Sequence, residues 1–138
     1  MPTFSLTSLN NLKSCNDDLI RLFNIVVKYY DCSIVDGFRN KVMQNKAYNE
    51  GKSKLQWPNS LHNRYPSRAV DVIPYPLSYE RLGALDRLEW CRFYHFIGFV
   101  LATAKSIGVN VRSGGDWDGD LDIRDQNFYD LPHWELIG

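Results

Sequence analysis

The sequence predicts a single α+β domain in which helices pack against a small antiparallel sheet. Three segments carry apolar residues at helical spacing, and four short segments have the β-branched or alternating character of strands. The chain has 138 residues, enough to bury one core, and it contains no repeat, linker or low-complexity tract. We therefore expect one domain over residues 1–138, with no second module.

The first helix and strand follow from the region after residue 15. In "NDDLIRLFNIVVKYY", Asn16 is a suitable N-cap, acidic residues fill the first turn, and apolar residues recur with the helical period up to Tyr30. "CSIVDGF" then predicts a short strand that ends at Gly37. "RNKVMQNKAYNEG" predicts a polar, amphipathic helix that ends at Gly51.

The middle of the chain predicts a loop, a strand and a long helix. The segment from Lys52 to Pro66 is rich in Ser, Asn and Pro, whereas "AVDVIPY" is a strand stopped by prolines. His62 is therefore expected on a loop and Asp71 on a strand. From Leu85 to Ile107 the chain is apolar around most of the helical circumference, as in a helix packed centrally under a sheet, and His95 within it is expected to be packed.

Two further strands are expected near the C-terminus, in "VNVRSGG" and "LPHWELI", on either side of the acidic loop "DWDGDLDIRDQNFYD". The cysteines Cys15, Cys32 and Cys91 are odd in number and lie in apolar segments, so we expect reduced core residues.

Charge and the N-terminus limit the partners. Sixteen basic and sixteen acidic residues give a net charge of zero, which argues against nucleic acid and against an anionic membrane surface as partners. The N-terminus lacks the features of a signal peptide, and no apolar run is long enough to span a bilayer. We expect synthesis in the cytoplasm, no stable membrane association and a monomer.

His62, Asp71 and His133 form a candidate zinc site. Catalytic zinc commonly takes three ligands from His and Asp or Glu and leaves a fourth position for water. Side chains alternate along a strand, so His133 should share a face with Glu135, and Asp71 should face away from its two valine neighbours. Two adjacent strands would then bring Asp71 and His133 together. The alternative is that these histidines are structural, hydrogen-bonded residues.

Peptide hydrolysis also needs a base and a group that stabilises the oxyanion. Asp130, three residues before His133, is the nearest candidate base, although an acid near a proline is often a turn residue. We choose Arg39 for the oxyanion or for holding substrate. Trp134 and other aromatic residues flank the predicted site and are candidates for a substrate groove, with core packing as the alternative.

A calcium site is a second metal hypothesis. Asp116, Asp118 and Asp120 have the 1, 3, 5 spacing of a calcium loop, but the glycine at position 6 and the glutamate at position 12 of an EF-hand are absent. A solvated acidic turn explains the same pattern.

Several motifs resemble a known family. "SLHNRYPSRAVDVIPYP" and "DLPHWEL" are similar to the two metal motifs of the zinc peptidases that group D-Ala-D-Ala carboxypeptidases and dipeptidases with bacteriophage L-alanyl-D-glutamate endopeptidases. "IVDGFRNKVMQNKAYNEGKSK" and "VRSGGDWDGD" extend the resemblance to Ile34–Leu136. One departure is that "HNRYPSRAVD" is two residues longer than the common pattern between the histidine and the aspartate, and it lacks the glycine.

The resemblance implies the hedgehog/D-Ala-D-Ala-peptidase-like fold and a set of roles. It implies zinc bound by His62, Asp71 and His133, with Asp130 as general base and Arg39 on the substrate or oxyanion. Further residues implied near the zinc ligands or the substrate are Ser60, Gln44 and Trp134. Calcium in the acidic loop is implied for the phage branch.

These observations predict a phage endolysin that hydrolyses a peptidoglycan stem peptide, with the L-alanyl-D-glutamate bond as the first choice. The alternatives are a D-Ala-D-Ala carboxypeptidase and a non-catalytic binding module of the same fold that retains the metal. By analogy with enzymes of this kind, we expect the protein to reach the host cell wall through a membrane lesion made by another protein.

Overall fold

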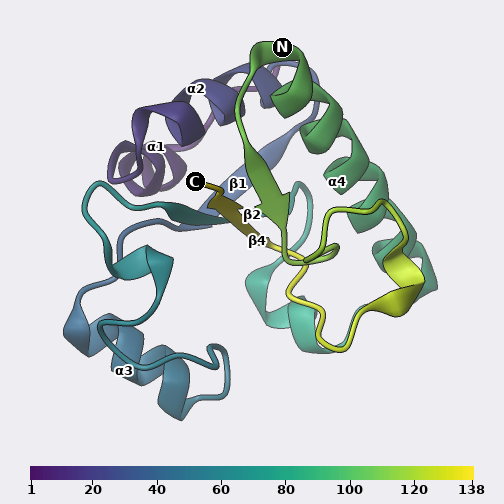
Figure 1. The fold of residues 1–138 in the computed structure, drawn as a ribbon. Coiled ribbons are helices and arrows are strands. Elements are labelled where there is room, and N and C mark those ends of the chain that lie inside the picture. Colours follow the sequence, from purple (N-terminus) through teal and green to yellow (C-terminus); the bar gives the residue numbers. More distant parts are fainter.

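The computed structural model describes residues 1–138 and has a four-stranded sheet with helices around it (Figure 1). The strands are β1 (Cys32–Asp36), β2 (Ala69–Pro74), β3 (Val111–Ser113) and β4 (His133–Leu136), in the spatial order β1-β2-β4-β3. Every neighbouring pair is antiparallel. The predicted α+β class and the four predicted strands are confirmed.

The helices are α1 (Leu6–Lys13), α2 (Asp17–Val26), α3 (Lys41–Asn49) and α4 (Arg87–Ile107). Figure 1 shows α1, α2 and α4 arching around the sheet, while α3 stands apart from them beside the teal loop that follows it. Short 3₁₀ turns lie at Leu61–Asn63, Tyr79–Gly83 and Ile123–Asp125. None of the helices is both long and apolar enough to cross a membrane.

Capping residues explain where the two main core helices begin and end. The Asn16 side chain accepts a hydrogen bond from the Asp18 backbone at the start of α2. At the start of α4, Asp86 and Glu89 form a reciprocal capping box. Gly108 ends α4 in the left-handed conformation at φ 74°, which glycine adopts without steric cost.

The core lies on one face of the sheet. Val70 and Val72 of β2 and Trp134 of β4 are fully buried there, against residues of α2 and α4. Trp134 packs edge-to-face on Phe23, with ring centroids 6.2 Å apart. Because strand side chains alternate, Asp71 and His133 point to the opposite face, as predicted.

The burial of Trp134 corrects the expectation that it contacts substrate. Its side chain has no exposed area and lies on the core face of β4, away from the histidine that precedes it. The tryptophan is a packing residue.

Helix α4 is also less buried than its composition suggests. Its buried residues form one stripe, whereas Leu88 is 76% exposed. Cys91 is exposed, unlike Cys15 and Cys32, so it is not the core residue that we expected. His95 is exposed as well, and its Nδ1 lies 2.9 Å from the Tyr30 hydroxyl.

Helix α1 was not predicted from the sequence. It is attached to the edge of the sheet by polar contacts, which apolar periodicity does not indicate. The Ser8 hydroxyl accepts a hydrogen bond from the Ile34 backbone N–H, and the Asn11 side chain donates one to the Ile34 carbonyl. These bonds satisfy an edge strand that would otherwise present free backbone groups. Helical periodicity does not reveal contacts of this kind.

Candidate metal site and active centre

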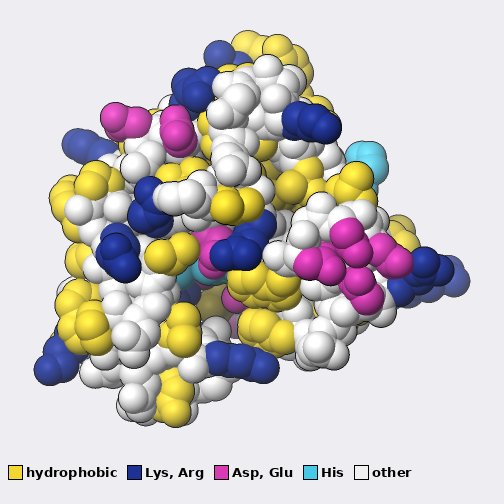
Figure 2. Space-filling model, viewed as in Figure 1, with side chains coloured by type: hydrophobic (Ala, Val, Ile, Leu, Met, Phe, Trp, Pro, Cys, Tyr) yellow, Lys and Arg dark blue, Asp and Glu magenta, His cyan; other side chains and the backbone are white.

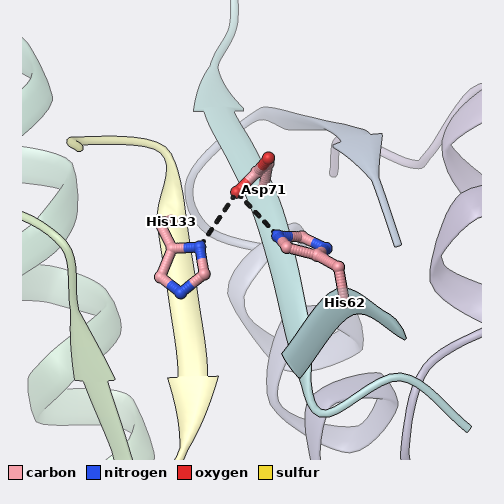
Figure 3. A group of neighbouring side chains, drawn as sticks. All are labelled: His62, Asp71 and His133. Atoms are coloured by element: carbon pink, nitrogen blue, oxygen red, sulfur yellow. Dashed lines mark ion pairs between the residues drawn. The ribbon is translucent and has the colours of Figure 1, made fainter. Parts of the chain in front are cut away.

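Asp71 and His133 lie directly opposite each other on β2 and β4, and His62 reaches them from the 3₁₀ turn at Leu61–Asn63 (Figure 3). The Oδ1 atom of Asp71 is 3.4 Å from the His62 Nε2 atom and 3.4 Å from the His133 Nδ1 atom. All three side chains are buried. The structure therefore brings together the three residues that the sequence predicts as ligands.

Hydrogen bonds fix which nitrogen of each ring faces Asp71. His62 Nδ1 is 2.7 Å from the Gly37 carbonyl oxygen, which only accepts, so this nitrogen carries the proton. His133 Nε2 is 2.8 Å from a carboxylate oxygen of Glu135. The outer nitrogen of each ring is thus held by an acceptor, and the inner nitrogen points towards Asp71, as in many metal sites.

Two of the inward atoms lack a hydrogen-bond partner. His62 Nε2 and Asp71 Oδ1 are buried and make no hydrogen bond. A buried polar atom without a partner destabilises the folded state, so such groups normally have a ligand or an ion. One ligand atom from each of the three residues lies within 4.8 Å of the others. The group can therefore hold a metal ion.

The charges at this site are strongly coupled. Burial alone would raise the pKa of Asp71, but the neighbouring His62 and His133 hold it well below its usual value. Burial opposes the charged form of His133, yet the carboxylates of Asp71 and Glu135 raise the pKa of His133 to about 9. A metal at this position would compete with that proton.

Arg39 contacts Asp71 from the side away from the histidines. Its NH2 group donates to Asp71 Oδ2 at 2.8 Å, and its Nε donates to Asp36 Oδ2 at 2.5 Å. Its NH1 group donates to Gln44 Oε1 at 3.3 Å. The guanidinium is buried and orients the Asp71 carboxylate. Its predicted contact with substrate or oxyanion stays a prediction.

Gln44 and Ser60 support the segment that carries His62. Gln44 is fully buried in α3, and its Oε1 atom also accepts from the Asn63 side chain at 3.1 Å. Ser60 accepts from the His62 backbone N–H at 3.1 Å and so caps the 3₁₀ turn. Both residues act through their neighbours, as expected for residues that orient metal ligands.

Asp130 lies beside the cluster and lines the adjoining cleft. Burial and the nearby Asp71 carboxylate raise the pKa of Asp130 to about 6. The backbone N–H of Asp130 donates to the Gly114 carbonyl at 2.9 Å, and the Gly114 N–H donates to the His133 carbonyl at 2.8 Å. These bonds hold Asp130 next to His133.

Gly114 is a site residue that the sequence reasoning missed. A Cβ atom there would lie 2.1 Å from the Asp130 carbonyl oxygen, so any other residue would displace the Asp130 backbone. The available signal was the Gly-Gly pair directly after the β3 strand.

Trp117 was missed too, because tryptophan in an acidic loop has no helical or strand period. Its ring lies 5.4 Å from the His133 ring, and its Nε1 donates to the Phe128 carbonyl at 3.0 Å. Trp117 therefore lies beside His133 and lines the cavity that contains both histidines.

The acidic loop places three carboxylates close together. Ligand atoms of Asp116, Asp118 and Asp120 lie within 4.8 Å of one another, and only Asp116 is buried. Asp116 Oδ2 accepts from the Leu121 backbone at 2.9 Å, whereas its Oδ1 atom is buried without a partner. Figure 2 shows acidic side chains gathered over this loop, at the right.

A cleft opens on the metal-site side of the sheet. Its larger cavity has a volume of about 730 Å³ and contains Asp71, Asp130 and Tyr79 in its lining. A second cavity of about 390 Å³ contains His62 and His133 together with Asp130. Figure 2 shows this hollow near the middle of the face, with histidine and acidic atoms at its base and Lys or Arg side chains beside it.

Comparison with a solved structure identifies the fold. The chain is similar to the L-Ala D-Glu endopeptidase ChiX of Serratia marcescens, with a TM-score of 0.69 and 24% identity. The alignment covers 98% of this chain and 90% of that protein. This chain therefore has the same fold as that protein.

Sequence comparison identifies the family. The family model described as phage L-alanyl-D-glutamate peptidase matches residues 2–137, and the chain belongs to this family. The L-alanyl-D-glutamate peptidase of Escherichia phage T5 is 28% identical over 111 residues, which are 78% of this chain and 77% of that protein. The resemblance inferred from the motifs is confirmed, and the chain is a peptidase.

Proposed function

We propose that this protein is a zinc-dependent peptidoglycan peptidase that hydrolyses the L-alanyl-D-glutamate bond of stem peptides. The observation that carries the proposal is the buried group of His62, Asp71 and His133 at the base of a cleft, with two inward-facing atoms that have no hydrogen-bond partner. Membership of the phage L-alanyl-D-glutamate peptidase family supports the choice of bond.

The ligand set favours zinc over a hard cation. Two imidazoles and one carboxylate suit zinc, whereas magnesium and calcium prefer oxygen ligands. The Gly37 carbonyl and the Glu135 carboxylate orient the two rings, which increases the affinity of such sites. Arg39 donates to Oδ2 of Asp71, so that Oδ1 would be free to bind the metal.

The residues of the chain divide the chemistry among them. Bound zinc supplies a Lewis acid and lowers the pKa of water towards neutrality. Asp130 accepts a proton from the attacking water, whose oxygen forms a bond to the alanyl carbonyl carbon. Asp130 then donates that proton to the glutamate nitrogen as the C–N bond breaks. In the metal-free protein, burial and the Asp71 carboxylate raise the pKa of Asp130 to about 6, which favours proton uptake by this group.

The proposed setting is that of a phage endolysin. The protein would be made in the host cytoplasm and would reach the wall through a membrane lesion produced by another protein. The substrate is then a peptide attached to a glycan. The cleft is open on one face of the protein, which is compatible with a peptide that continues beyond the cleft.

Digestion of defined muropeptides tests the proposal. We expect the purified protein to release fragments that end in L-Ala, with D-Glu as the new N-terminus, and a chelator should abolish this release. Mass spectrometry of the products reads the bond directly. Release of free D-Ala would instead support a D-Ala-D-Ala carboxypeptidase, and full activity in excess chelator would contradict the zinc mechanism.

Two aspartate variants separate the base from the ligand. Asp130→Asn should keep its zinc and its fold but lose roughly two to four orders of magnitude in kcat, the usual worth of general acid–base catalysis. Asp71→Asn should lose zinc affinity, because it replaces a charged ligand with an amide and removes one of the two carboxylates that pair with Arg39. Zinc content and turnover are measured on the same samples. If Asp130→Asn loses zinc as readily as Asp71→Asn, the roles are assigned wrongly.

We also propose that the acidic loop binds calcium through Asp116, Asp118 and Asp120. The argument is the buried Oδ1 atom of Asp116, which has no hydrogen-bond partner and belongs to the group of converging carboxylates. Burial raises the pKa of Asp116, and a divalent cation would offset the repulsion among the three. The same loop carries Trp117 against His133, so calcium would stabilise one wall of the active centre.

Calorimetry and activity at controlled calcium concentrations test this second proposal. We expect the wild-type enzyme to bind calcium and to be activated by it. Asp118→Ala should remove both effects while zinc remains bound. Asp125→Asn is the matched control, because it removes one acid from the same loop outside the group of three. A wild-type enzyme that shows no heat of calcium binding would contradict the proposal.

A further inference from the structure

The cleft beside the metal site contains one cation without an acidic partner. The cationic residues that line its two cavities are Arg39, Lys52, Lys54 and Arg112. Arg39 is paired with Asp36 and Asp71, and Arg112 is paired with Glu135 at 2.9 Å. Lys52 has Glu50 at 3.3 Å. Lys54 forms no ion pair, although it shares both cavities with Asp130.

Aromatic rings keep the two lysines at the cleft. The Lys54 ammonium lies 4.0 Å from the centroid of the Phe128 ring, and the Lys52 ammonium lies 5.1 Å from that of Tyr79. Phe128 and Tyr79 both line the larger cavity. The ammonium groups are thus directed along the walls of the cleft, and Lys54 keeps its charge available for a ligand.

The backbone between the lysines is tied to the metal site by a buried amide. Gln44 Nε2 donates to the Ser53 hydroxyl at 2.9 Å and to the Leu55 carbonyl at 2.7 Å. The Oε1 atom of the same side chain accepts from Arg39, which holds Asp71. The backbone position of Lys54 is therefore coupled to that of the candidate metal ligands by these hydrogen bonds.

The free carboxylate of the proposed substrate would be stabilised by a cation in the cleft such as Lys54. A glutamate residue has two carboxyl groups, and a peptide that continues beyond it uses only one of them. The other remains ionised and enters a cleft that already contains the Asp130 carboxyl. Like charges in a partly desolvated cleft repel, so binding requires a positive group nearby.

We propose that Lys54, assisted by Lys52, binds the free carboxylate of the acidic residue on the leaving-group side of the cleaved bond. This inference rests on the proposed function and specifies how the same site selects its substrate. It also fixes the direction of the peptide, with the acidic residue towards the Lys52–Leu55 segment and the alanyl side away from it.

A pair of peptides that differ in one group tests the inference. One contains L-Ala-D-Glu with the free carboxylate, and the other contains the carboxamide in its place. We expect the wild-type enzyme to cleave the carboxylate peptide with a kcat/KM roughly 10- to 100-fold higher, the usual value of one charge-assisted hydrogen bond. In Lys54→Met the ratio should fall towards one, whereas Lys54→Arg should preserve most of it.

The control is Lys46→Met. Lys46 lies on α3 and lines neither cavity of the cleft, so its loss changes the net charge equally without removing a cation that lines the cleft. This variant should keep the wild-type ratio. Methionine at position 54 retains an unbranched side chain over Phe128, and Lys52→Met provides a second variant with a smaller expected fall in the ratio.

The possible results separate the two proposals. Wild-type cleavage of both peptides at equal kcat/KM would overturn the carboxylate site but leave the proposed function standing. An unchanged ratio in Lys54→Met would do the same. Cleavage of neither peptide by the zinc-loaded wild type would overturn the proposed function, and the inference with it.

Discussion

The active centre depends on the burial of Asp71 between two histidines. A carboxylate buried on a strand destabilises the fold unless cations or hydrogen bonds surround it. Here Arg39 satisfies one oxygen at 2.8 Å, and the other faces two imidazole nitrogens, each 3.4 Å away. The outer nitrogen of each ring is bound to an acceptor, which keeps the inner nitrogens directed towards Asp71. These three inward-facing atoms are the ones that can bind a metal ion.

A buried polar network transmits this constraint to the substrate cleft. Arg39 connects Asp71 to Gln44, and Gln44 connects the Asn63 side chain beside His62 to the segment that carries Lys54. Gln44 is fully buried, so a substitution at one residue of the network would shift the positions of the others. The candidate metal ligands and the proposed carboxylate site at Lys54 are thus connected by one hydrogen-bond network.

The sequence predicted the features that depend on periodicity. Alternation along β2 and β4 placed Asp71 and His133 on one face, and the turn residues around them marked the strand ends. The motifs added the family, which the family model confirms, and a candidate ligand set whose three side chains lie together in the structure. These features are local, so they can be read from a few consecutive residues.

Features that depend on contacts between distant segments were missed or wrong. Trp134 could be placed on the core face only from the same alternation that placed His133, yet its proximity to the motif suggested a substrate role. Trp117 lies in a loop that has no hydrophobic period, so its contact with His133 could not be predicted. Gly114 is needed because its backbone lies against that of Asp130, which is distant in sequence. Such contacts depend on the packing of the whole chain.

X-ray absorption at the zinc edge of the zinc-loaded protein tests the central claim most directly. The account predicts a first shell of nitrogen and oxygen atoms at about 2.0–2.1 Å, with the outer-shell scattering of two imidazoles. One further light atom, from solvent, should complete the four-coordinate site. A sulfur ligand at about 2.3 Å, or a spectrum without imidazole scattering, would show that zinc binds elsewhere and would contradict the account.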